Sequence, residues 1–397
     1  MEISKHPIWN NIKGYKKPVH LVRFFLAKHF ASLFPKAVFI GITGSVSKTS
    51  TTISCFHVLS EKYLTIATDI NLDSILNIPI TLLQTRLKTK KVILEMGVEY
   101  PGEMDFYLSL IRPATAIVTR ISYAHSEFLG NIDSILKEKA PLVKQLPKTG
   151  FAILNFDDPY CRRLAKETEA RVIFFGTDSR NCDVWVSNVR LEDGLTKFEL
   201  NYGVERVEVI FKFLGRHMVY PALAAAALGI SCDMNLIQIK KGLEKVMPLP
   251  HRLQLLEGIN GFNVIDDTHN SSPAAVEESL NVLNELPARK RVAILGEMKE
   301  LGKYSENFHR LLAQKIFKDK IDLVLLGSGD ALFIADELIK LGFPEERVEA
   351  NLSNTQIVSK IIRYASKGDL VLIKGSHAVK LNEVVQRVTK QSKHKNG

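Results

Sequence analysis

The sequence predicts an α/β protein with two domains, a central one on a mostly parallel sheet covered on both faces and a smaller one after it. Short apolar runs alternate with helix-compatible stretches from residue 37 to about residue 247, and a second alternation follows residue 248. Pro248 and Pro250 interrupt regular structure between the two series, as a linker does. With 397 residues, the chain is long enough for two or three domains that each bury a core.

Six apolar runs of the first series are expected strands, and several end in a polar or charged residue. Ligands of open parallel sheets bind outside the carboxyl ends of the strands, so we expect the chemistry at these residues. Three later segments alternate like antiparallel strands and precede an Ala-rich helix at residues 221–228. The six strands are 38–42, 64–68, 91–95, 114–119, 151–155 and 171–175, and the later segments are 184–189, 197–202 and 207–213.

The second series predicts a smaller, Rossmann-like α/β domain. Its expected strands are 262–265, 291–295, 323–326 and 370–373, separated by helices such as 274–283 and 305–317. We therefore expect an N-terminal segment (1–36), a central domain (37–247), a C-terminal domain (248–390) and a polar tail (391–397) that frays.

The composition is that of a globular protein rather than a disordered or membrane-embedded one. Hydrophobic residues make up 46% of the chain, charged residues 24%, and the mean hydropathy is +0.01. No apolar run reaches the roughly 20 residues that a membrane span needs. The four cysteines lack metal-ligand spacing, so neither a disulfide framework nor a zinc site is indicated, and a cytoplasmic location fits.

The net charge of +10 favours an anionic partner, such as a nucleotide, a phosphorylated substrate or an anionic membrane surface. The positive charge gathers at the two ends of the chain, and no recognition motif interleaves aromatic with basic residues. We therefore expect no nucleic-acid partner.

Residues 1–36 form a basic amphipathic segment. The stretch 18–34 is helix-compatible, with a broad apolar face and basic residues beside it. It is not a signal peptide, because charges interrupt the apolar run and no small-residue cleavage site follows. Two hypotheses remain: a helix packed on the nucleotide domain, or a helix in peripheral contact with an anionic membrane.

The stretch 37–49, AVFIGITGSVSKT, predicts a phosphate-binding loop between a buried strand and a helix. Backbone N–H groups of Gly44, Ser45 and Ser47 and the start of the helix would face the phosphates. Lys48 adds a charge, and the Thr49 hydroxyl can ligate Mg²⁺. The general pattern has Gly where Ser47 stands, so an ordinary strand-to-helix turn with a surface lysine is the alternative.

Two further residues are expected near this loop. Glu95 ends an apolar strand, where a carboxylate can bind Mg²⁺ directly or through water, or can serve as a helix N-cap or ion-pair partner. His125 follows the strand 114–119 and would face the same crevice, although a lone histidine is usually structural.

Eight short motifs follow one another along the chain: GITGSVSKTS, LEMG, AHSEFLG, the EKA around Lys139, LNFDDP, PHRL, DDTHNSSP and GEMKELG. They occur in the same order as in the Mur ligase family, which the chain resembles over residues 37 to about 388. Members of this family are ATP-dependent amide-forming ligases of peptidoglycan-precursor synthesis. Many short motifs in register are far more specific than any one of them. LEMG, DDTHNSSP and GEMKELG are most similar to the member that adds D-alanyl-D-alanine to a UDP-muramoyl tripeptide.

The resemblance implies a P-loop ATPase domain and a two-metal site. Such ligases phosphorylate a carboxylate of the precursor peptide with ATP and let an amine, an amino acid or a dipeptide such as D-Ala-D-Ala, attack the acyl phosphate. Lys48 would bind the β- and γ-phosphates, Thr49 and Glu95 one Mg²⁺, and His125 a second. Lys139 matches a lysine that is often carbamylated and would then be a metal ligand. The alternative is a solvated lysine on a helix.

The remaining implied residues lie on both sides of the linker. Asn155 and Asp157 match the stretch of the family that lies near the adenine of the bound nucleotide. Arg252 matches the arginine that reaches the γ-phosphate, and Asp267 the aspartate at the nucleotide, so that closure of two domains would complete the site. Asn270 and Ser271 would face the incoming amine, whereas Asp266 is expected to be structural.

Three departures from the family pattern stand out. Ser47 replaces a glycine, which costs on the order of 1 kcal/mol or more if that position needs positive φ. Met218 and Pro221 stand where the family has two asparagines, so hydrogen bonds from those amides near the nucleotide are lost. Only residues 1–36 precede the phosphate loop, so the usual domain that binds the UDP-sugar is not expected.

Two other functions are compatible with parts of the sequence. A degenerate homologue could bind nucleotide or precursor as a scaffold, which the residues at 47, 218 and 221 motivate. Folylpolyglutamate synthase also lacks the extra N-terminal domain, but its aspartate motif differs from DDTHNSSP. The retained set of metal and phosphate ligands favours a catalytic ligase, which we expect to be a monomer.

Overall fold

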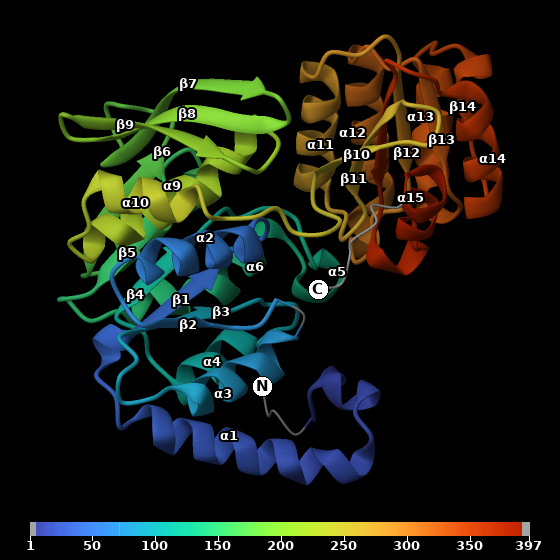
Figure 1. Ribbon diagram of the computed structural model, residues 1–397. Coiled ribbons are helices and arrows are strands. Elements are labelled where there is room, and N and C mark those ends of the chain that lie inside the picture. The colour runs from blue at the N-terminus through green and yellow to red at the C-terminus, as the bar shows by residue number, and fades with distance from the viewer. Residues whose placement is uncertain (1–4, 71, 391–397) are drawn as a thin grey trace. The chain divides into compact units, whose positions relative to one another are not determined.

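The computed structural model describes residues 5–70 and 72–390 (Figure 1). They divide into two compact units. Unit 1 comprises residues up to Arg190 together with Lys197–Phe211 and Met218–Val246. Unit 2 comprises Leu191–Thr196, Lys212–His217 and the chain from Met247 onward. The expected polar tail, 391–397, lies outside the described residues.

Unit 1 is built on a nine-stranded sheet in the order β2-β3-β1-β4-β5-β6-β7-β8-β9. The neighbouring pairs from β2 to β7 are parallel, and two-residue turns join β7 to β8 and β8 to β9 as in hairpins. The strands are β1 (Phe39–Thr43), β2 (Thr65–Ala67), β3 (Lys91–Glu95), β4 (Thr115–Val118), β5 (Phe151–Asn155), β6 (Arg171–Gly176), β7 (Val184–Glu192), β8 (Leu195–Tyr202) and β9 (Glu205–Phe211).

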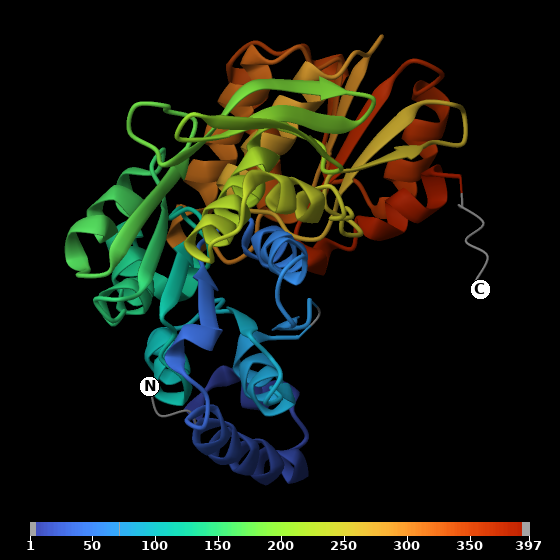
Figure 2. The same cartoon turned by 60° about the vertical axis from the view of Figure 1, so that its left-hand side comes forward.

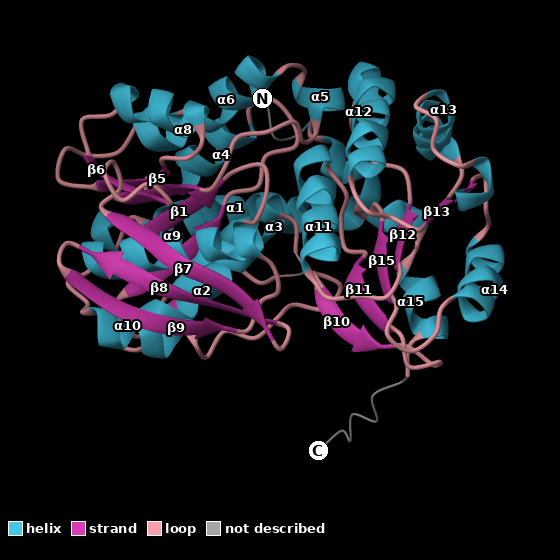
Figure 3. Cartoon of the chain, turned by 90° about the horizontal axis from the view of Figure 1, so that it is seen from above, coloured by secondary structure: helices cyan, strands magenta, loops and turns pink. Residues whose placement is uncertain are grey.

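Helices cover both faces of the parallel part of this sheet, which explains why β1, β3 and β4 are apolar without alternation (Figure 3). One group, α2, α9 and α10, packs together, and α1, α3 and α4 form another. The helices are α1 (Lys17–Ala31), α2 (Lys48–Ser60), α3 (Ser74–Gln84), α4 (Glu103–Leu110), α5 (Ser126–Leu129), α6 (Ile132–Lys139), α7 (Pro141–Lys144), α8 (Pro159–Leu164), α9 (Val219–Ser231) and α10 (Leu236–Leu243).

Unit 2 has a six-stranded sheet in the order β10-β11-β15-β12-β13-β14, in which only the β10–β11 pair is antiparallel. The two faces carry separate apolar clusters, one with α11, α12 and α13 and the other with α14 and α15. The elements are β10 (Gln254–Glu257), β11 (Asn263–Asp267), α11 (Pro273–Glu285), β12 (Arg291–Leu295), α12 (Ser305–Lys318), β13 (Leu323–Leu326), α13 (Leu332–Lys340), β14 (Val348–Glu349), α14 (Asn354–Tyr364), β15 (Leu370–Lys374) and α15 (Asn382–Val388).

The predicted α/β architecture, with a mostly parallel sheet in each part, is confirmed. Expected strands 91–95, 151–155, 291–295 and 323–326 have the bounds of β3, β5, β12 and β13. The strand expected at 207–213 ends at Phe211, and Lys212–His217 belongs to unit 2. The short strands β10 and β14 were not predicted, because four and two residues at a sheet edge carry too little pattern.

The helix expected near residues 18–34 is α1, and it packs on unit 1 as the first hypothesis stated. Phe24, Ala27 and Ala31 are buried, and the Phe24 ring lies 5.1 Å from that of Phe106 on α4. Figures 1 and 2 show α1 along the surface beside α3 and α4. Among the described helices, none is long and apolar enough to span a bilayer.

Candidate functional site

The loop between β1 and α2 is held in one conformation by the segment that follows β4. Gly44 has φ of 148°, and a Cβ at this position would lie 2.0 Å from Thr119 Oγ1, so only glycine fits. Ser45 N–H donates to Arg120 O (2.7 Å), so the prediction that this N–H faces a phosphate is wrong, and the Ser45 hydroxyl donates to Ser122 O (2.7 Å). The loop therefore presents the start of α2 from a pre-formed turn, as phosphate binding requires.

Ser47 occupies the left-handed region, with φ of 60° and ψ of 13°, directly before α2. The departure from glycine at this position therefore carries the strain that the sequence suggested. The Ser47 side chain makes no capping hydrogen bond to α2.

We predict that Ser47→Gly stabilises the protein by about 0.5 kcal/mol, since relief of left-handed strain slightly exceeds the extra chain entropy of glycine. Thermal unfolding measures the change. Ser50→Gly is the matched control, because it makes the same chemical change inside α2 and should destabilise by about 1 kcal/mol. Equal shifts in the same direction would contradict the strain assigned to Ser47.

Two of the predicted magnesium ligands lie together. Thr49 Oγ1 donates to Glu95 Oε1 at 3.1 Å, joining the first turn of α2 to the carboxyl end of β3. The Lys48 side chain lies over the same strand end, with Cε 3.7 Å from where a Gly97 Cβ would be. Mg²⁺ in nucleotide sites is held by one or two protein oxygens together with phosphates and water, so a hydroxyl and a carboxylate fit it.

Lys139 ends α6 and is 1% exposed, so the hypothesis of a solvated surface lysine is wrong. Burial, and then the nearby Lys48 ammonium, lower the pKa of Lys139 to about 7, against the opposing effect of Glu103, Glu138 and Glu99. A buried amine with a pKa near neutrality is partly uncharged at pH 7 and can react as a nucleophile.

His125 stands immediately before α5 with φ of 55° and is partly buried. Within residues 5–70 and 72–390, no three His, Cys, Asp or Glu side chains gather closely enough to hold a metal by themselves. A second metal at His125 would thus need oxygen ligands from a modified lysine, phosphates or water.

Asn155 ends β5 and Asp157 follows it, and both are engaged in hydrogen bonds within unit 1. The Asn155 amide donates to Thr119 O (2.9 Å), and Asp157 Oδ2 accepts from the Tyr220 hydroxyl (2.9 Å). These bonds tie β5 to the segment after β4 and to α9. The side chains therefore hold the sheet edge beside the phosphate loop, whatever else they bind.

In unit 2 the predicted residues gather at the carboxyl ends of β11 and β15. Asp267 Oδ2 accepts from Lys374 Nζ (2.5 Å) and from the Ser279 hydroxyl (2.6 Å). Lys374 Nζ also donates to Asn270 O (3.0 Å). Sequence reasoning missed Lys374, although a lysine that ends the apolar strand LVLIK was a signal for it.

The other predicted residues of unit 2 flank this pair. Arg252 Nη2 lies 3.2 Å from His269 Nε2, and partial burial and Arg252 lower the pKa of His269 to about 4, so the ring is neutral and accepts from the guanidinium. The Ser271 hydroxyl is buried and has no hydrogen-bond partner among the described residues. Asp266 accepts from Thr268 and contacts His251, as a structural carboxylate would.

Two family models match the chain: the Mur ligase middle domain over residues 42–229 and the Mur ligase, glutamate ligase domain over residues 251–377. The UDP-N-acetylmuramoyl-tripeptide--D-alanyl-D-alanine ligase of Bacillus subtilis is 31% identical over 348 residues, which cover 87% of this chain and 75% of that protein.

Solved structures of similar fold belong to proteins named MurF. One from Acinetobacter baumannii superposes with a TM-score of 0.84 at 23% identity, over 92% of this chain and 80% of that one. Another from Thermotoga maritima, in complex with ADP, has a TM-score of 0.80 at 23% identity, over 93% of this chain and 83% of that one. At this identity the likeness establishes a shared fold.

Proposed function

Because the chain belongs to the Mur ligase family, we propose that it is a cytoplasmic, ATP-dependent amide ligase acting on a peptidoglycan-precursor peptide. The incoming amine would be an amino acid or a dipeptide such as D-Ala-D-Ala, the substrate named in its Bacillus subtilis relative. The gathering of Lys48, Thr49 and Glu95 at one edge of the unit 1 sheet carries this proposal.

The chemistry has two steps. A substrate carboxylate oxygen attacks the γ-phosphorus of ATP, the bond to the β-phosphate oxygen breaks, and an acyl phosphate and ADP result. The amine then attacks the acyl carbon, loses a proton, and inorganic phosphate leaves as the amide forms. Neither step requires a covalent bond to the protein, so positioning and neutralisation of charge are its main contributions.

Each proposed residue has one task in these steps. Lys48 and the N-terminus of α2 would bind the phosphates, with Arg252 at the γ-phosphate and Asp267 at the nucleotide. Thr49 and Glu95 would hold Mg²⁺, which neutralises phosphate charge when bound, and His125 with a carbamylated Lys139 would hold a second ion. Asn270 and Ser271 would orient the amine, with the buried Ser271 hydroxyl as a hydrogen-bonding group.

The test is release of ADP and phosphate from the purified protein with Mg²⁺ and ATP, across a panel of UDP-muramoyl peptides and amines. Release that needs both an acceptor and an amine supports the ligase, and Lys48→Ala should abolish it and weaken ATP binding. If no pair stimulates release and Lys48→Ala leaves ATP affinity unchanged, the ligase proposal fails. ATP binding without release in every combination would instead favour the scaffold.

We also propose that the N-terminal segment makes peripheral contact with an anionic membrane. The face of α1 opposite its buried side is apolar, since Val19, Val22, Phe25 and Leu26, which share one side of the helix, are each 50% exposed or more. Residues 5–36 include seven Lys and Arg, and no Asp or Glu occurs from residue 3 to residue 60. This charge complements anionic headgroups and would repel the same face of a second copy.

Replacing Val22 and Phe25 together by Asp should reduce sedimentation with phosphatidylglycerol-containing vesicles by about tenfold or more, since it removes apolar area and adds repelled charge. Ile237→Asp is the control, because Ile237 on α10 is 67% exposed and lies outside α1. Binding that is equal for pure phosphatidylcholine vesicles, or that survives the double substitution, would refute membrane contact through α1. Failure here leaves the ligase proposal intact.

A further inference from the structure

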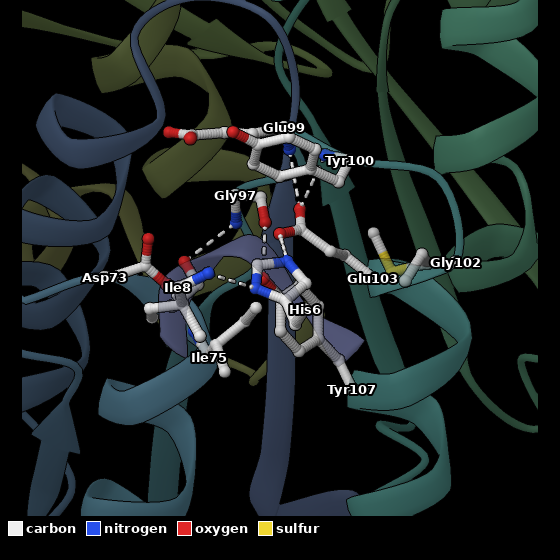
Figure 4. A network of polar contacts seen from close by, with 12 residues as sticks. His6, Ile8, Asp73, Ile75, Gly97, Glu99, Tyr100, Gly102, Glu103 and Tyr107 are labelled. Carbon is white, nitrogen blue, oxygen red and sulfur yellow. Dashed lines mark hydrogen bonds and ion pairs between the residues drawn. The ribbon is translucent and has the colours of Figure 1, made fainter. Parts of the chain in front are cut away.

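A buried histidine of the N-terminal segment is bonded to the first residue of α4. His6 is 3% exposed and Glu103 is 4% exposed (Figure 4). The backbone N–H of Ile8 donates to His6 Nδ1 (3.1 Å), so the ring hydrogen is on Nε2, which donates to Glu103 Oε1 (2.7 Å). The two residues are 97 positions apart, and the ring of His6 fixes the orientation of the carboxylate.

The other oxygen of this carboxylate holds the loop that follows β3. Glu103 Oε2 accepts from the backbone N–H of Glu99 (2.6 Å) and of Tyr100 (3.2 Å). Those residues lie four and five positions after Glu95, the proposed Mg²⁺ ligand. His6 and the two backbone amides together hold both oxygens of the Glu103 carboxylate. Removal of His6 leaves one oxygen without its donor, so the carboxylate can rotate away from the two amides.

Three further hydrogen bonds connect the same loop to α4, to α3 and, through Ser74, to the end of β3. The Tyr107 hydroxyl donates to Gly97 O (2.8 Å), and Gly97 N–H donates to Ser74 Oγ (3.0 Å). Ser74 Oγ in turn donates to Glu95 O (2.9 Å). A shift of the loop is therefore transmitted to the backbone of Glu95.

Tyr100 connects the loop to the element that carries the other proposed metal ligand. Its ring meets His6 edge-on at 5.3 Å and lies 4.6 Å from the ring of Phe128 on α5. α5 begins directly after His125. His6 thus contacts both the carboxylate and the aromatic ring that bridge the segments of Glu95 and His125.

We propose that His6 is a positioning residue of the metal site, acting through Glu103 on the loop after Glu95 and through Tyr100 on α5. The N-terminal segment is then part of the catalytic unit rather than an appendage to it. The expected effect of His6 on turnover rests on the proposed ligase function. The packing of His6 against Glu103 and Tyr100 does not depend on that function.

His6→Ala in the full chain should accelerate amide hydrogen exchange at Glu99 and Tyr100 and raise the Mg²⁺ concentration for half-maximal ADP release by about 10- to 100-fold. His6→Gln should restore much of both, since its amide can accept from Ile8 and donate to Glu103. Tyr63→Phe is the stability control, because it removes a hydrogen bond to Cys232 O (2.7 Å) elsewhere in unit 1.

Unchanged exchange at Glu99 and Tyr100 in His6→Ala would overturn the inference, as would an equal shift in Mg²⁺ dependence for Tyr63→Phe. Exchange needs no catalysis, so it tests the hold of His6 on the loop even if no acceptor supports ADP release. In that case the ligase proposal fails while faster exchange still supports the positioning role.

Discussion

Lys139→Ala is expected to lower the rate of acceptor-dependent ADP release by about 10²- to 10³-fold, the usual cost of losing one preorganised charged group at a reacting phosphate. With a pKa of about 7, roughly half of the Lys139 amine is uncharged at pH 7, against about one in three thousand for an ordinary lysine. The neutral amine can attack CO₂, forming an N–C bond and releasing one proton. The product is a carboxylate-like carbamate able to bind Mg²⁺.

Native mass spectrometry of protein incubated with bicarbonate tests the modification, as an adduct of one CO₂ that Lys139→Arg lacks. Lys137→Ala is the matched control, since Lys137 lies on the same helix but is exposed and should retain both adduct and turnover. Acetate added to Lys139→Ala is expected to recover part of the rate by supplying the missing carboxylate. Full activity of Lys139→Ala without any additive would exclude the proposed role.

Lys374→Met is expected to destabilise unit 2 by about 3–5 kcal/mol, because it leaves the carboxylate of Asp267 buried without its cation. The Lys374 side chain is 2% exposed and that of Asp267 13%, so water cannot replace the lost ion pair. Replacing both partners, as Lys374→Met with Asp267→Asn, should recover part of the loss, since no uncompensated charge remains.

The two units can be followed separately during denaturation. Both tryptophans, Trp9 and Trp185, lie in unit 1, so their fluorescence reports that unit. Far-ultraviolet circular dichroism reports both units, and Lys374→Met should move its transition to lower denaturant while the fluorescence transition stays in place. Lys340→Met, at an exposed lysine of α13, should move neither. A Lys374→Met curve that matches the Lys340→Met curve would show that the pair contributes little.

Most strands of both sheets could be predicted from the sequence, because a strand buried on both faces is a short apolar run with sharp ends. β3 and β12 illustrate this. Strands at the edge of a sheet were harder to predict. β10 alternates over only four residues, and its burial depends on a partner strand that the local pattern does not reveal. Residues 212–217 belong to unit 2 although they follow a strand of unit 1, which no local signal indicates.

Some neighbours in the candidate site could likewise be predicted from the sequence, and others could not. Glu95 and Thr49 could be proposed as neighbours, since parallel strands end at one edge and a helix starts there. His6 and Glu103 could not, because 97 residues separate them and a buried histidine has no distinctive sequence context. The end of the strand LVLIK marked Lys374 as a candidate, but its partner could not be predicted, since only the register of β11 with β15 places it opposite Asp267.

The sequence by itself determined the family, the position of most strands along the chain and the residue types offered to a nucleotide and Mg²⁺, because these depend on local pattern and spacing. The tertiary structure decided how the surroundings of a residue change its pKa, its backbone strain and its exposure. Lys139 became a buried amine with a pKa near neutrality, Ser47 a strained left-handed residue, and the N-terminal helix a packed element with an exposed apolar face. Desolvation, backbone strain and burial depend on contacts between distant segments, and those exist only once the chain has folded.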